Sequence, residues 1–282
     1  MTFDVPTELT LFAESVRVAL GGWEPPREPE LGAWQDDRDD ALARRLADAG
    51  WSELWAGEEL LGAAAAGGIE LGRAAAPICL VDEVTLGAPL CIDGRARHGR
   101  GAASLALPQP GGHLALGIPR SEIRAEPTID GSGTIEVEID GWNPLEPVAA
   151  VACWRAWNVA TLAYFAGLAA RVLELAVEHA RSREQFGAPL ASIPAVQSRL
   201  ADAALATDGL TLLAWAATGT EFAIQNCELT WAGTACCEVT ASAHQVYGAL
   251  GFALESGLHV YYRRARSVQA WAVAVLDATS RG

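Results

Sequence analysis

The feature that most constrains this chain is the length of its helical segments after residue 148. Apolar residues recur there at three- and four-residue spacing, which is typical of helices that bury one face. Four segments show the pattern, namely 149–182, 193–217, 221–247 and 254–278. Long helices joined by short connections pack as antiparallel neighbours. We therefore expect residues 149–282 to form a C-terminal four-helix bundle.

The first half of the chain divides into a helical part and a part with strand character. Residues 1–76 carry further helical patterns and are predicted to form an N-terminal helical domain. Residues 77–148 change to short alternating or apolar runs separated by Gly-rich turns, and are predicted to form a reduced middle β domain with few, short strands. The predicted fold class is therefore mainly α with a small β region.

Charge and hydropathy exclude two classes of partner. The formal net charge is −15 and the pI is about 4.7, so we expect no nucleic-acid partner, because phosphates require a basic surface. Hydrophobic residues make up 51% of the chain, but charged residues or glycines interrupt every long apolar stretch, and we expect no membrane span. The surplus of apolar residues favours a large subunit interface and hence an oligomer.

The cysteines and the first residues indicate a cytoplasmic protein. The six cysteines include no Cys-x-x-Cys pair and no histidine at metal-ligand spacing, so we expect reduced thiols and no metal site. The first residues lack the basic and apolar regions of an export signal, and we expect no export.

Two segments carry polar residues and glycines within otherwise apolar helices. The first is 181–187, Arg-Ser-Arg-Glu-Gln-Phe-Gly, and the second is 244–252, His-Gln-Val-Tyr-Gly-Ala-Leu-Gly-Phe. Taken alone, the first has a plain explanation, because arginine offsets the dipole at a helix C-terminus and glycine ends the helix. The glycines of the second allow another backbone or a pyrophosphate to approach closely.

Together, the two segments resemble the acyl-CoA dehydrogenase family. Residues 178–202 are similar to its Arg-x-Gln-Phe-Gly segment and the helix after it, and residues 244–265 to its Gln-x-x-Gly-Gly-x-Gly segment with the following Arg-Asp-Ala. Residues 44–55 and 70–77 resemble its first-domain signatures. The resemblance covers nearly the whole chain, although the middle third matches only in position. It implies an acyl-CoA dehydrogenase-like fold with the three domains described above.

The resemblance also implies a cofactor site that two subunits share. In this family the bundle of one subunit contributes to the FAD bound by its neighbour. Carried over by position, Arg183, Gln185 and Phe186 would face the diphosphate and adenosine end of FAD, and Gln245 with Gly248 would line the same region. The residue types suit this role, because arginine pairs with phosphate oxygens and glycine exposes backbone N–H groups.

The chain departs from the family pattern at several cofactor positions. Ala249 stands where a second glycine is usual, and Pro194 where a glutamine is usual, although Gln197 is nearby. The middle domain is short and contains no Gly-Ser-Asp-like turn in residues 99–114. We therefore expect that the chain cannot hold the flavin ring by itself.

The family's catalytic carboxylate is absent from both of its usual positions. Acyl-CoA dehydrogenation requires a Glu that removes the α-proton while the flavin takes the β-hydride. Alignment from Arg263 puts Trp271 at one position, and counting back from Arg183 puts Trp157, followed by Asn158, at the other. We predict no catalytic residue in this chain. Three other bundle acids, Glu174, Glu178 and Glu255, are expected on solvated faces or in structural ion pairs.

Bulky indoles at and near these positions predict a filled site. Trp154, Trp157 and Trp271 would occupy the space that an acyl chain otherwise takes. A hollow around Trp157 and Ala272 would count against this prediction.

The departures fit the trimmed, non-catalytic subunit of a heteromeric acyl-CoA dehydrogenase, as found in steroid and other CoA-ester catabolism. The resemblance then implies a longer catalytic partner, a heterotetramer, FAD shared with that partner, and an acyl-CoA bound through it. Two alternatives stay open. One is a homo-oligomeric flavoprotein of the same fold with altered chemistry. The other is a flavin-free scaffold or interaction subunit.

Overall fold

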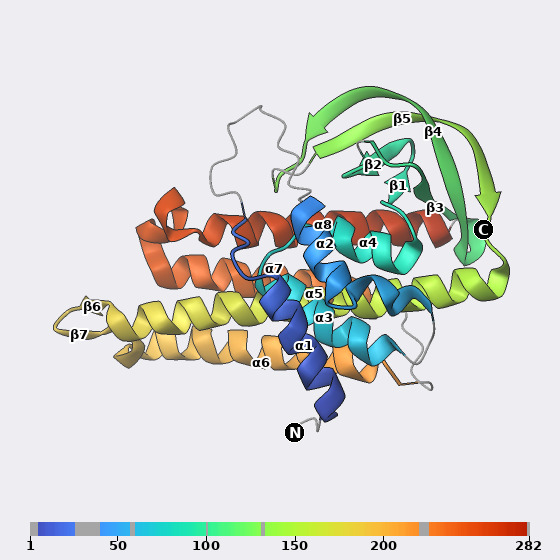
Figure 1. The fold of residues 1–282 in the computed structure, drawn as a ribbon. Coiled ribbons are helices and arrows are strands. Elements are labelled where there is room, and N and C mark those ends of the chain that lie inside the picture. The colour runs from blue at the N-terminus through green and yellow to red at the C-terminus, as the bar shows by residue number, and fades with distance from the viewer. Residues whose placement is uncertain are drawn as a thin grey trace.

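The computed structural model describes residues 5–25, 40–56, 60–99, 101–130, 133–219 and 226–280. Figure 1 shows a body of long helices with a small curved sheet on one side. The N-terminal helices are α1 (Thr7–Ala19), α2 (Asp40–Asp48), α3 (Leu61–Arg73) and α4 (Cys79–Leu86), with the 3₁₀ helix η1 (Trp51–Ala56) after α2. The bundle helices are α5 (Pro147–Ser182), α6 (Pro194–Ala216), α7 (Asn226–Tyr247) and α8 (Leu258–Ser280).

Helix α5 is the centre of the molecule and packs against α3, α4, α6, α7 and α8. Pro147 occupies its first turn, where the missing N–H is harmless and the fixed φ suits a helix. By length and composition α5 is the described helix that could cross a membrane, but 72% of its most apolar stretch is buried inside the fold. Its apolar residues are therefore accounted for by the core of the bundle.

The N-terminal helices attach to the bundle through a close crossing of α3 and α5. A Cβ on Gly72 would lie 2.0 Å from the carbonyl oxygen of Tyr164, and one on Gly167 would lie 1.9 Å from that of Ile69. Only glycine fits at either point, because any side chain would push the helices apart. The close crossing explains why α3, which is rich in alanine and glycine, is buried against α5.

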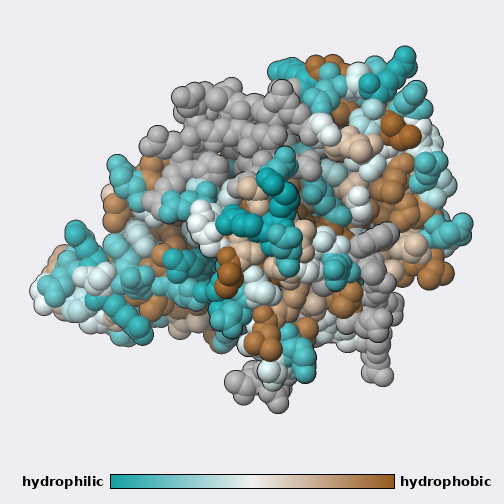
Figure 2. All heavy atoms as spheres, in the orientation of Figure 1, coloured by the Kyte–Doolittle hydropathy of each residue, from teal (hydrophilic) through white to brown (hydrophobic). Residues whose placement is uncertain are grey.

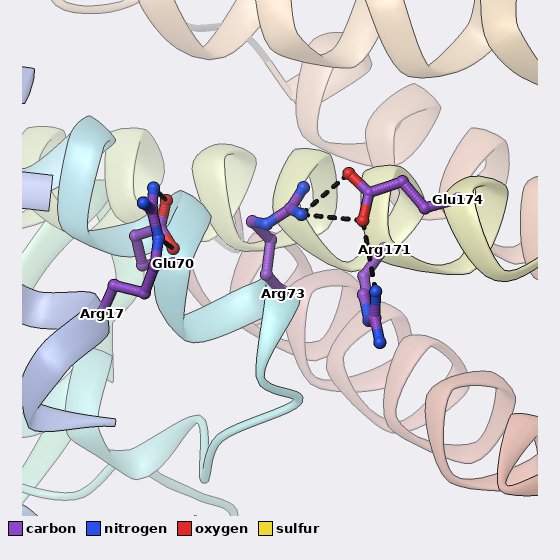
Figure 3. Close-up of polar contacts among 5 residues, drawn as sticks. All are labelled: Arg17, Glu70, Arg73, Arg171 and Glu174. Atoms are coloured by element: carbon purple, nitrogen blue, oxygen red, sulfur yellow. Dashed lines mark hydrogen bonds and ion pairs between the residues drawn. The ribbon is translucent and has the colours of Figure 1, made fainter. Parts of the chain in front are cut away.

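Ion pairs at and just below the surface continue this attachment (Figure 3). Arg17 of α1 donates to Glu70 of α3, with both N–O distances 2.9 Å. Arg73 of α3 donates to both carboxylate oxygens of Glu174 of α5 at 2.8 Å, and Arg171 approaches the same carboxylate at 3.4 Å. The expectation that Glu174 is a structural partner on an exposed face is confirmed.

The sheet is antiparallel, with strand order β1-β2-β5-β4-β3. Its strands are β1 (Cys91–Ile92), β2 (Arg95–Arg97), β3 (Leu105–Gln109), β4 (His113–Pro127) and β5 (Gly133–Pro144). The prediction that all strands are short was wrong, because β4 and β5 form one long hairpin. Register shifts between Ile118 and Arg124 interrupt the alternation that marks a strand in sequence.

The prediction of strand character from Pro77 onward was wrong for the first residues of that part, since residues 79–86 form helix α4. Gly87, in a left-handed conformation, ends this helix. A short apolar run is equally consistent with a buried strand or a buried helix, and packing of α4 against α5 selects the helix. The strands begin at Cys91.

The bundle follows the predicted segments closely. Residues 221–225, with which the third segment was expected to begin, lie outside the described residues. The last segment begins later than expected, because two short 3₁₀ helices, η5 (Gly248–Phe252) and η6 (Leu254–Ser256), precede α8.

The hairpin is fixed to the bundle by a buried ion pair at its turn. Arg264 of α8 donates to Asp130 at 2.8 Å, and both side chains are at most 2% exposed. Thr128 donates to the same carboxylate from the end of β4. A buried charge is tolerated only with such partners, so the turn has one preferred place on α8.

Candidate functional site

The first predicted segment forms a tight hairpin beyond the end of α5. Arg183 leaves the helix in an extended conformation, and β6 (Glu184–Gln185) pairs with β7 (Ala188–Pro189). The two turn residues, Phe186 and Gly187, have φ of 56° and 82°, the combination that a two-residue hairpin turn requires. Phe186 is 95% exposed, and Arg183 and Gln185 are also exposed. A large aromatic ring is thus presented to solvent in a conformation unusual for phenylalanine.

The second predicted segment forms the end of α7. Gln245 is exposed on the last turn, and Gly248 ends the helix with φ of 61°. No atom lies within 4 Å of the position that a Cβ on Gly248 would take. The backbone at this point is therefore open to a ligand or to another subunit.

The structure brings the two segments to the same end of the bundle, at the left of Figure 1. The His179 ring of α5 stacks on the Tyr247 ring of α7 with centroids 3.9 Å apart. Ala180, Leu190 and Val246 form a small buried cluster beneath them. Figure 2 shows this end as mostly hydrophilic. All five predicted cofactor residues therefore share one polar end of the molecule.

The two departures at this end have local explanations. Pro194 is the first residue of α6, where proline is favoured. The nearby Gln197 donates from Nε2 to the Ala191 carbonyl oxygen at 2.8 Å, so its amide holds the loop before α6. Ala249 is exposed in η5. Gln197 is thus already engaged within the chain.

Of the two positions where the sequence predicts that a carboxylate is missing, Trp157 lies buried on α5, far from the hairpin, and Trp271 lies half-buried on α8. Trp157 is 1% exposed, and its Nε1 donates to Asp82 Oδ1 of α4 at 3.0 Å. Trp154 lies edge-on to Trp157 with centroids 5.7 Å apart. The position on α5 is therefore occupied by an indole with a satisfied donor.

A buried ion pair connects this position to the second one. Arg97 of β2 donates to both oxygens of Asp82 at 2.7–3.1 Å, and the side chains are 1% and 0% exposed. The Arg97 guanidinium also lies over the Trp271 ring, 5.2 Å from its centroid, within cation–π range. We call these five residues, Trp154, Trp157, Asp82, Arg97 and Trp271, the tryptophan–arginine cluster.

Asp82 and Arg97 were not predicted as site residues from the sequence. Asp82 lies within the apolar run 79–86, and an acid in such a run needs a buried partner. The sequence therefore indicates that Asp82 has a buried partner. It does not identify the partner, since Arg97 belongs to a strand of another layer. The cluster supplies a carboxylate near the family's base position, and its oxygens accept bonds from Arg97 and Trp157.

Two hollows among the described residues lie beside the cluster and do not reach its centre. One, of about 390 Å³, lies against Cys153, one helical turn before Trp157. Another, of about 400 Å³, lies against the outer side of Trp271. Trp157 and Ala272 line neither of them and are both buried. The structure therefore gives no support to an open acyl site at these two residues.

The other two bundle acids singled out from the sequence lie on the surface. Glu178 and Glu255 are exposed, as expected for solvated faces. Within the part of the chain that the structure describes, His, Cys, Asp and Glu form no group of three that could hold a metal ion.

Comparison with known proteins places these features in a family. Residues 158–272 match the family model described as acyl-CoA dehydrogenase, C-terminal domain. A 3-sulfinopropanoyl-CoA desulfinase of Paraburkholderia xenovorans is 34% identical over 119 residues, which are 40% of this chain and 30% of that protein. The mitochondrial short-chain specific acyl-CoA dehydrogenase of Bos taurus is 29% identical over 187 residues, 61% and 45% of the two chains. The matches thus span less than half of these relatives' lengths.

Solved structures with the same fold include two named as pairs of proteins. The Tcur3481–Tcur3483 steroid acyl-CoA dehydrogenase has a TM-score of 0.77 at 20% identity, with 96% of each chain covered. The ChsE4–ChsE5 complex from Mycobacterium tuberculosis has a TM-score of 0.70 at 18% identity, with 99% of this chain and 96% of the other covered.

These matches and the architecture define an acyl-CoA dehydrogenase fold with a reduced sheet. Residues 158–272 carry the C-terminal domain of the acyl-CoA dehydrogenase family, and the resemblance inferred from the sequence is confirmed. Its predicted fold class is confirmed.

Proposed function

We propose that this chain is the shorter, non-catalytic subunit of a two-subunit, FAD-dependent acyl-CoA dehydrogenase. Such an enzyme removes hydrogen from the α and β carbons of an acyl-CoA thioester. The observation that carries the proposal is a contrast within one helix. At its C-terminal end α5 presents the cofactor motif on the surface, and near its N-terminal end Trp157 lies in the closed tryptophan–arginine cluster.

The exposed end of the bundle fits the adenosine and diphosphate part of FAD. Arg183 supplies a guanidinium for phosphate oxygens, Gln185 and Gln245 supply amides, and Phe186 supplies a ring for the adenosine. The open backbone at Gly248 allows close approach of a phosphate. When bound, FAD supplies the hydride-accepting ring. We propose that this chain contributes only to the distal end and that the partner holds that ring.

The closed cluster is what makes the subunit non-catalytic. A general base must lie within hydrogen-bond reach of the proton that it removes. Asp82 is completely buried and accepts hydrogen bonds from Arg97 and Trp157, so a substrate has no access to its oxygens. An acyl-CoA would therefore bind and react in the partner subunit.

We propose that the assembly is a heterotetramer with a longer, catalytic member of the same family, located in the cytoplasm. The names of two structural neighbours as protein pairs support a partner of this kind. One of them is named a steroid acyl-CoA dehydrogenase, which supports a bulky, steroid-like acyl group as the substrate class.

Co-purification with flavin analysis tests the proposal. The chain is expressed alone and together with longer family members from the same genome, and flavin absorbance and acyl-CoA turnover are measured for each preparation. We expect flavin and turnover only in the complex. Stoichiometric flavin and turnover by the chain alone would instead establish the homo-oligomeric flavoprotein.

Substitution of Arg183 distinguishes the proposal from a flavin-free scaffold. Arg183→Ala is expected to lower the flavin content of the complex without dissociating it. Arg199→Ala, which removes an exposed arginine of α6, is the matched control and should keep the flavin. If both variants retain the same flavin content and activity, the chain is a scaffold.

A further inference from the structure

Two aromatic rings join the segments that carry the proposed cofactor residues. His179 lies four residues before Arg183, and Tyr247 lies between Gln245 and Gly248. Their rings are nearly parallel, with an interplanar angle of 15° and centroids 3.9 Å apart. The stack therefore connects the last turn of α5 to the last turn of α7.

Further contacts give the stack a fixed place on α5. The Tyr247 hydroxyl donates to the Leu175 carbonyl oxygen at 3.2 Å, one helical turn before His179. The Arg183 N–H donates to the His179 carbonyl oxygen at 2.9 Å, and the Leu190 N–H donates to the Arg183 carbonyl oxygen at 2.8 Å. A chain of contacts thus runs from Tyr247 through α5 to Arg183 and Leu190, the residues that flank the β6–β7 hairpin.

We infer that His179 and Tyr247 are positioning residues, whose stack holds the Arg183–Phe186 hairpin and the Gln245–Gly248 helix end in one relative orientation. This inference rests on the proposed function, because the two segments need a common orientation only if they bind one molecule. Neither ring is assigned a contact with that molecule. Their effect is to place the groups that would make such contacts.

The local electrostatics agree with this role. Burial and the nearby positive charge of Arg183 lower the pKa of His179, so its ring is favoured in the neutral form. Burial and Glu178 raise the pKa of Tyr247, which keeps its hydroxyl protonated and able to donate. The imidazole that stacks on the phenol ring is therefore favoured without a charge of its own beside Arg183.

Nuclear magnetic resonance of the chain alone tests the mechanical part of the inference without flavin. Tyr247→Leu and His179→Leu remove one ring each, and Tyr247→Phe and His179→Phe keep an aromatic pair. We expect the leucine variants to shift the backbone amide signals of Gly187 and Leu190, and the phenylalanine variants to restore them. Unchanged hairpin signals in both leucine variants, with the fold retained by circular dichroism, would overturn the inference.

The rate of FAD release from the co-expressed complex tests the link to the cofactor. Loss of one aromatic pair is expected to speed release about fivefold in either leucine variant. The phenylalanine variants should stay within about twofold of the native complex. Faster release on Arg183→Ala, together with unchanged release in both leucine variants, would overturn the positioning role. A native complex that contains no flavin would overturn the proposed function, while the amide shifts would still report the coupling of the two segments.

Discussion

The two ends of α5 differ in what they do with polar and aromatic side chains. Toward the N-terminal end, Trp157 and Arg97 both donate hydrogen bonds to Asp82 in the interior. At the C-terminal end, Arg183 and Phe186 project from a hairpin into solvent. One helix therefore combines a closed, buried end with an open end on the surface. Substitutions in the tryptophan–arginine cluster should therefore mainly lower stability. Substitutions in the exposed hairpin should mainly lower flavin binding.

The largest stability effect is expected for Asp82→Asn. This change keeps the shape but leaves the Arg97 guanidinium buried without a counter-charge, and should lower the free energy of unfolding by about 3–5 kcal/mol. Urea denaturation measures it. Glu174→Gln is the matched control, because it breaks the exposed pair with Arg73 and should cost about 0–1 kcal/mol. Equal losses for the two variants would contradict the importance given to the buried pair.

Trp157→Ala should produce a loss of similar or slightly smaller size. Removing a fully buried indole leaves a cavity and an unused acceptor on Asp82, with an expected cost of about 3–5 kcal/mol. Trp142→Ala is the control, since Trp142 is 62% exposed and its removal should change stability by less than about 0.5 kcal/mol. An accompanying gain of acyl-CoA turnover by the variant chain alone would contradict the non-catalytic assignment.

A smaller loss of stability, which depends on pH, is expected from two histidines at the end of the bundle that carries the hairpin. Burial lowers the pKa of His179 and of His244 below the ordinary 6.5, so the unfolded chain binds more protons in the window below that value. This contribution to stability is present above pH 6.5 and is lost as pH falls through the folded pKa values. Urea denaturation between pH 7.5 and 5.5 should show the decline. His179→Phe should reduce this decline in stability. His113→Phe, which removes an exposed histidine, should leave the decline unchanged.

The smallest effect on stability, and of opposite sign, is expected for Phe186→Asn. Asparagine tolerates positive φ and suits a turn before glycine, so unfolding should become harder by about 0.5–1 kcal/mol. Loss of the ring should at the same time lower the flavin content of the co-expressed complex. A variant that loses stability would show that Phe186 packs against its own chain. The thermal midpoint and the flavin absorbance give the two readings.

The sequence predicted the parts of the fold that depend on local pattern. The bundle helices were found because their periodicity persists over many turns. The segment after α5 was found as a motif, but its hairpin was not predicted. Helix α4 and the length of β4 were not, since a short apolar run is ambiguous and the register shifts after Ile118 break the alternation. Tertiary packing decides both cases.

The candidate site was predicted to a similar extent. Trp157 and Trp271 were located by counting from two arginines, but the ion pair between them was not foreseen. Asp82 and Arg97 come from different layers of the fold, and no local spacing relates them to Trp157. Long-range pairs of this kind become visible only when α4, β2, α5 and α8 are assembled.

The ion pair between Arg264 and Asp130 has a consequence for how the molecule opens. A long two-stranded hairpin is marginally stable by itself. Because its turn is held by a buried charge on α8, release of the hairpin would separate the Arg264 guanidinium in the bundle from the Asp130 carboxylate. The hairpin and α8 should therefore unfold as one cooperative unit. Amide hydrogens of β4 beside the turn should exchange with solvent as slowly as those in the middle of α8.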